Sequence, residues 1–138
     1  MALGDSYEQT QARVTAQIEQ AQERARRATA LRQQVEQLVG EARSPRQELQ
    51  VRVDAQGRLL DLELSDAALD LGPRDLAQLV LRTAAAAHQR AAEQVGRLAE
   101  EAFGEGSDLA RRVAEEAGAR AAAGPAAGSV SQEKGPWA

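Results

Sequence analysis

Residues 48–65 read ELQVRVDAQGRLLDLELS, and the alternation in this stretch sets the architecture of the chain. On both sides of Gln56-Gly57, apolar and polar residues alternate with the period of two of a β-strand, and glycine supplies the positive φ of a tight hairpin. Antiparallel pairing with residue numbers that sum to 113 puts the apolar side chains on one face and sets Arg52 opposite Asp61 on the other. The predicted apolar face consists of Leu49, Val51, Val53, Leu60, Leu62 and Leu64.

Helical patterns flank the hairpin on both sides. The first covers residues 6 to about 42, with apolar residues at spacings of three and four, and Gly40 followed by Ser44-Pro45 marks its expected end. The second opens at Gly72-Pro73, where proline suits the first helical turn, and extends to Phe103. This order predicts an α+β fold: a long helix, a β-hairpin of two to three strands, and a second long helix.

The predicted fold divides the chain into two parts. Residues 1–103 form an α-β-β-α unit, which Gly104-Glu-Gly-Ser107 ends. In residues 104–138, a weak helix from Asp108 to about Ala123 has Leu109 and Val113 as its only large apolar residues, and we expect an unstructured tail from Gly124 onward.

The apolar residues are too few for a large core. Of 138 residues, 30 are alanine and only 26 are Leu, Ile, Val or Phe. A two-stranded hairpin is marginal alone and needs cover on its apolar face, and a small core favours oligomerisation. We therefore expect a homodimer through the sheet, with the six apolar residues of the hairpin at its interface.

Several function classes are excluded by composition. The chain has no cysteine and one histidine, His88, so thiolate sites, histidine metal clusters and a Ser-His-Asp triad are not expected. His88 is expected at the surface or at an interface. Asp61, Glu63 and their neighbours fit no calcium loop and are interpreted as a solvated face. We expect no catalytic residues, metal or cofactor.

No apolar segment of 18 residues is present, so the chain is expected to be cytoplasmic without a membrane partner.

Charge is unevenly distributed along the chain. The net charge is −4 overall, but residues 1–46 hold seven arginines against six acids, whereas residues 47–72 hold two against six. Arginines therefore gather in the first helical segment, where two copies of that helix in a dimer would offer them to phosphates.

The hairpin motif, followed by Gly72-Pro73-Arg74-Asp75-Leu76 and an alanine-rich helix, resembles the YbaB/EbfC family of bacterial nucleoid-associated proteins over about three quarters of the chain. The resemblance implies a homodimer whose β-elements meet centrally, with helical arms that hold double-stranded DNA in the nucleoid. Carried over by position, the DNA-binding candidates, all assigned to the first helix, are Arg24, Arg27, Arg43 and Arg46.

An alternative remains open at this point. The acidic hairpin and weakly basic arms also fit a protein–protein interaction or secretion-associated adaptor module that uses the same dimeric fold without strong DNA binding.

Overall fold

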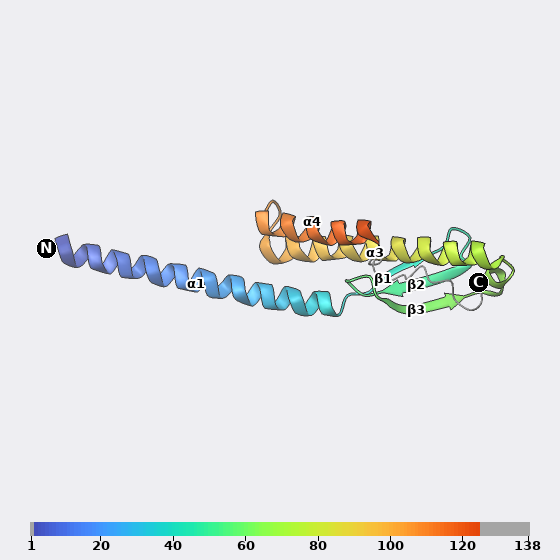
Figure 1. Ribbon diagram of the computed structural model, residues 1–138. Helices are drawn as coiled ribbons and strands as arrows, with labels where there is room; N and C mark the ends of the chain where they lie inside the picture. Colours follow the sequence, from blue (N-terminus) through green and yellow to red (C-terminus); the bar gives the residue numbers. More distant parts are fainter. Residues whose placement is uncertain (1, 125–138) are drawn as a thin grey trace, which may run out of the picture.

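The computed structural model describes residues 2–124 and confirms the α+β class (Figure 1). The elements in chain order are α1 (Ala2–Glu36), β1 (Gly40–Arg43), β2 (Leu49–Val53), β3 (Leu59–Leu64), α2 (Asp66–Leu69), α3 (Pro73–Phe103) and α4 (Asp108–Ala123). The strands form one antiparallel sheet in the order β1-β2-β3. Within the described residues, no helix is both long and apolar enough to cross a membrane.

The predicted end of the first helix is wrong, because α1 stops at Glu36 and Gly40–Arg43 forms the third strand of the sheet. Gly40 is needed for close packing. A Cβ there would lie 2.4 Å from the carbonyl oxygen of Ala87 and 2.7 Å from the Cβ of Ala91. Glycine therefore marks the place where β1 crosses α3, and it was misread as a helix stop.

The predicted hairpin register is confirmed over most of its length. Leu49 pairs with Leu64, Val51 with Leu62 and Arg52 with Asp61. A bulge after Arg52 changes the last pair, so that Val53 lies opposite Leu59 and not opposite Leu60. An extra residue at the end of a ladder increases the local twist, and periodicity alone does not reveal it.

The core lies between the sheet and α3, which packs on β1 and β2. Val51 and Val53 are fully buried there, and alanines of α3 let the helix approach the strands closely. The main cluster consists of Leu38, Ala42, Leu49, Val51, Val53, Leu79, Ala87, Ala91 and Val95. Strand β3 lies at the sheet edge, beyond the strands that α3 covers, and each of its leucines is at least one third exposed.

His88 belongs to this packed region, whereas the sequence predicted a position at the surface or at an interface. Its side chain is 8 % exposed and lies under the hairpin turn, where a Cβ on Gly57 would come within 2.5 Å of its Nδ1 atom. Gly57 also has a φ of 85°, a conformation that glycine adopts without strain.

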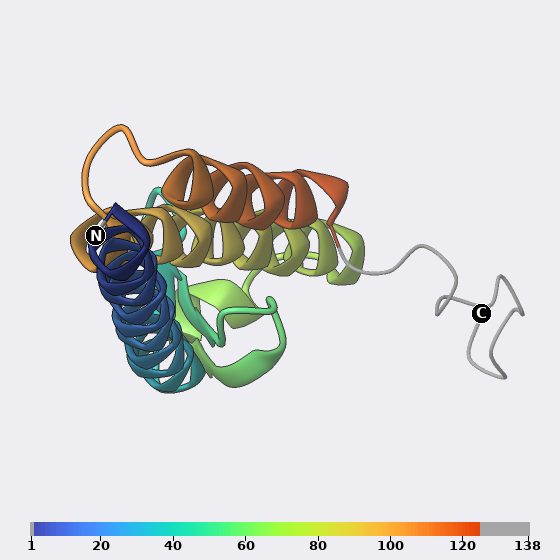
Figure 2. The ribbon, with the colours of Figure 1, turned by 90° about the vertical axis from the view of Figure 1, so that its left-hand side faces the viewer.

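Helix α4 packs along α3, on the side of α3 away from the sheet (Figure 2). Small residues allow this approach, since a Cβ on Gly96 would lie 3.3 Å from the Cβ of Ala114. The Ser107 hydroxyl caps the helix by accepting a hydrogen bond from the backbone N–H of Ala110 at 3.4 Å. Leu31 of α1, Ala99 of α3 and Ala110 of α4 form a second small cluster. The tail expected after Gly124 lies outside the described residues.

Candidate nucleic-acid interface

Helix α1 projects from the body of the protein as an arm (Figure 1). It has 35 residues, which corresponds to about 52 Å at the usual helical rise. Residues 6–30 are all exposed, and Leu31 is the first buried side chain of the helix. Residues 13–32 hold five arginines and two glutamates, a net charge of +3. Over its whole length the helix is balanced, with five arginines and five acids, so its positive charge is concentrated in residues 13–32.

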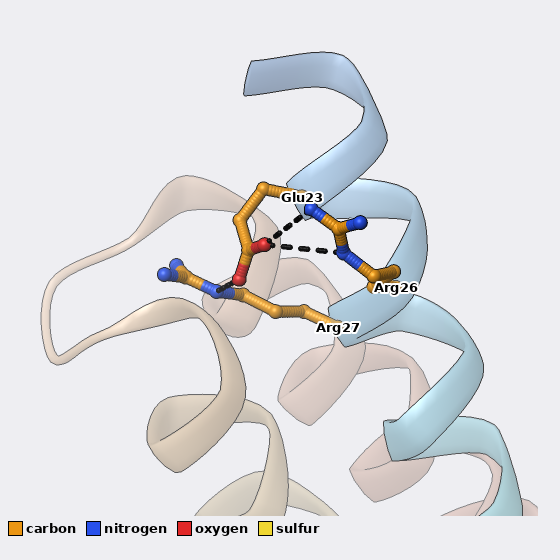
Figure 3. A network of polar contacts seen from close by, with 3 residues as sticks. All are labelled: Glu23, Arg26 and Arg27. Carbon is orange, nitrogen blue, oxygen red and sulfur yellow. Dashed lines mark hydrogen bonds and ion pairs between the residues drawn. The ribbon is translucent and has the colours of Figure 1, made fainter. Parts of the chain in front are cut away.

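A polar network on the arm joins two of its arginines through one carboxylate (Figure 3). Arg26 Nη2 donates to Glu23 Oε2 at 2.9 Å, and Arg27 Nε donates to Glu23 Oε1 at 3.3 Å. Because Arg26 and Arg27 follow Glu23 by three and four residues, one turn of helix brings both guanidinium groups to it. Arg26 is not among the four arginines predicted from the sequence. Its spacing from Glu23 was the signal that places it in this group.

The network leaves a surplus of positive charge on the surface. The pKa of Glu23 is lowered mainly by the hydrogen bond and the positive charge of Arg26, and further by those of Arg27. This carboxylate is therefore ionised at neutral pH. The side chains of Arg26 and Arg27 are 71 % and 53 % exposed. Exposed ion pairs of this kind contribute little to stability, so a phosphate can compete for the guanidinium groups.

The other candidates are not on the first helix, which corrects the sequence assignment. Arg43 is the last residue of β1, and Arg46 lies in the turn to β2; both are exposed. Buried Ser44 fixes this turn, since its hydroxyl accepts from the N–H of Leu49 at 3.1 Å and donates to Glu48 Oε1 at 3.0 Å. The pKa of Glu48 is lowered, first by a hydrogen bond from the backbone N–H of Glu48 itself, and then by the Ser44 hydroxyl and by Arg46.

The four predicted arginines form two separate groups in one protomer. Helix α1 leaves the sheet at one end, and β1 leads from that end to the turn that carries Arg46 (Figure 1). Arg24 and Arg27 thus lie on the arm, whereas Arg43 and Arg46 lie towards the opposite end of the sheet. Only the arm group includes the network around Glu23.

The six hydrophobic residues predicted for a dimer interface also separate into two sets. Leu49, Val51 and Val53 are at most 2 % exposed, beneath α3. Their neighbours on the edge strand remain open, with exposed fractions of 55 % for Leu60, 36 % for Leu62 and 43 % for Leu64. Because Leu62 pairs with Val51 and Leu64 with Leu49, the exposed leucines continue the buried face past the edge of α3.

Within residues 2–124, no cluster of three or more His, Asp or Glu side chains is arranged to hold a metal ion.

The sequence model of the YbaB/EbfC DNA-binding family matches residues 9–106, from the arm to the loop that follows α3. Helix α4 begins after the matched segment. No curated protein and no solved structure matches the chain.

Proposed function

Because the chain belongs to the YbaB/EbfC DNA-binding family, we propose that it is a non-enzymatic, nucleoid-associated protein that binds double-stranded DNA as a homodimer in the cytoplasm. The observation that carries the proposal is the exposed arginine group on the arm: Arg24, with Arg26 and Arg27 around Glu23. Arginine–phosphate contacts provide affinity and orientation, and DNA shape provides any sequence preference.

Dimerisation is part of the proposal and is supported by the edge of the sheet. Strand β3 presents both unpaired backbone groups and the exposed leucines Leu60, Leu62 and Leu64. An exposed edge of this kind is normally covered by another strand or helix. A second copy that covers β3 doubles the number of arms, and each arm brings its own arginine group. Arg43 and Arg46 then serve as a second set of phosphate contacts near the sheet.

A mobility-shift titration at low salt tests the arm directly. We expect duplex DNA to bind at micromolar protein or below, and Arg24→Glu with Arg27→Glu to weaken binding at least about tenfold, because phosphate contacts are lost on both arms. The matched control is Arg111→Glu with Arg112→Glu, which makes the same charge change at two exposed positions of α4.

Two results would overturn this assignment of the site. One is no binding of the native protein to any duplex under these conditions. The other is equal weakening by both double variants, which would show that only net charge matters. Far-UV circular dichroism confirms that each variant keeps its helices.

A second candidate function, a protein-interaction module on the same dimeric fold, is favoured by one observation. The arm also carries exposed apolar residues, with 67 % of Tyr7, 47 % of Val14 and 53 % of Ile18 accessible. A protein that remains dimeric, does not bind DNA and captures a partner through these residues would support this function in place of the first.

A further inference from the structure

A groove of about 580 Å³ lies between α1, α3, α4 and the hairpin turn, and its lining includes neither the arginine group around Glu23 nor the edge strand β3. Its lining is mainly apolar. Leu109 is 44 % exposed at its wall, and Phe103 and Val113 are half-buried. The charged residues Arg32, Glu116 and Arg120 also line it, and Arg120 Nη2 donates to Glu116 Oε1 at 3.1 Å. Exposed apolar surface of this kind, rimmed by charges, is typical of a binding site for an apolar side chain.

The chain itself contains a side chain suited to the groove. Helix α4 forms one wall and follows the family segment 9–106, and the same extension continues into residues 125–138, which include the single tryptophan, Trp137. We propose that the groove is the binding site for Trp137 of the same chain. The extension then provides both the wall of the site and its ligand. This inference does not depend on DNA binding.

The length of the connecting segment permits this docking. Arg120 lines the groove only four residues before Gly124, where α4 has ended. The 13 residues from Gly124 to Trp137 span up to about 45 Å when extended, whereas α4 is only about 24 Å long. Trp137 therefore reaches every residue along the α4 wall. A short linker of this kind gives an effective concentration on the order of millimolar, so docking within one chain competes well with docking between chains.

The chemistry of the groove suits an indole ring. Leu109, Val113 and Phe103 offer an apolar surface for the ring. The Glu116 carboxylate accepts from Arg120 through Oε1, and its second oxygen is an acceptor for the indole N–H. Arg32 and Arg120 are cations placed beside the same opening, and guanidinium groups pack favourably on indole faces. An aliphatic side chain would satisfy only the apolar part of this lining.

Intrinsic fluorescence of the full chain tests the proposal, since Trp137 is the only tryptophan. We expect emission that is blue-shifted from that of N-acetyltryptophanamide, and acrylamide quenching about threefold weaker, as for a largely buried ring. Leu109→Gln, at an exposed position that tolerates substitution, should move both values towards those of the free compound. The matched control, Leu81→Gln, changes a leucine that is 61 % exposed on α3 outside the groove, and should leave both values unchanged.

Three results would overturn the proposal. A solvent-exposed emission spectrum in the native chain shows that Trp137 does not dock. Equal changes in both glutamine variants show that the ring lies elsewhere. A blue shift that disappears on about hundredfold dilution shows that the groove is filled by another copy, because docking within one chain is independent of concentration.

Discussion

At the scale of single residues, two glycines determine how closely the sheet approaches α3. Gly40 faces the backbone carbonyl of Ala87, and Gly57 faces the ring of His88. The backbone at Ala87 is fixed by the helix, whereas an imidazole ring can rotate away. The two glycines therefore differ in how much an added methyl group lowers the free energy of unfolding.

We predict that Gly40→Ala lowers the free energy of unfolding by about 2–4 kcal/mol, since the methyl group displaces helix backbone. Gly57→Ala should cost about 1–3 kcal/mol from backbone strain and the contact with His88, and His88→Ala should relieve part of it. Gly118→Ala is the control: nothing lies within 4 Å of its Cβ, so it should stabilise α4 by about 0.5–1 kcal/mol. Urea unfolding measures all of these values. A Gly40→Ala chain as stable as the native one would contradict the close approach of β1 to α3.

Asp54 makes the hairpin sensitive to acid. Partial burial raises the pKa of Asp54, but hydrogen bonds and attraction from Arg58, with a hydrogen bond from the N–H of Gln56, outweigh this effect and lower the pKa below its usual value. The backbone N–H and Nε of Arg58 lie 2.8 and 2.7 Å from the two carboxylate oxygens. A lowered native pKa means that this stabilisation is present at neutral pH and is lost as the pH falls through the native pKa.

We predict that Asp54→Ala lowers the free energy of unfolding at pH 7 by about 1–2 kcal/mol. The difference from the native chain should shrink as the pH falls below about 4, because the carboxylate of the unfolded chain is then protonated before the native one, and it should be lost below the native pKa. Glu63→Ala, an exposed carboxylate on β3, should change stability by less than about 0.5 kcal/mol. A difference for Asp54→Ala that stays constant down to pH 2 would contradict the role of its charge.

At the scale of elements, the sequence predicted the hairpin and α3 well, because both are set by local patterns. Alternating leucines and valines determine the register of β2 and β3, and Gly72-Pro73 and Gly104 delimit α3. Strand β1 was missed because it has only four residues and its glycine is explained by contact with α3, not by its neighbours in sequence. For the same reason, Arg43 and Arg46 were wrongly assigned to the first helix. Periodicity also does not show that α3 covers only part of the sheet.

The edge strand β3 is the element on which the proposed dimerisation depends. We predict that Leu62→Arg leaves the protomer folded, because this side chain is already 36 % exposed, but abolishes self-association. Burying a charged side chain in an apolar interface is costly, whereas burying a leucine contributes about 1.5–3 kcal/mol. Light scattering should give twice the protomer mass of 14.7 kDa for the native chain and the protomer mass for the variant. A native protein that scatters as a folded monomer would contradict the dimer.

At the scale of the whole molecule, charge separation reconciles a net charge of −4 with DNA binding. Residues 13–32 of the arm carry a net charge of +3, whereas residues 47–72 around the hairpin carry a net charge of −4. Because charges beyond about 8–10 Å are screened at physiological salt, a phosphate near the arm interacts mainly with the local arginines and not with the distant acids. The net charge of the whole chain is therefore a poor guide to the charge at the proposed DNA-binding site.

The most direct test of the central claim, that arginines of the arm bind DNA phosphates, is the affinity of the native dimer for duplex DNA as a function of salt. Two arms that together engage about four to six phosphates predict a slope of log affinity against log salt of about −4 to −5. Between 50 and 200 mM salt the affinity should then fall roughly 10²–10³-fold. An affinity that salt leaves unchanged, or no duplex binding at micromolar protein in low salt, would contradict the account.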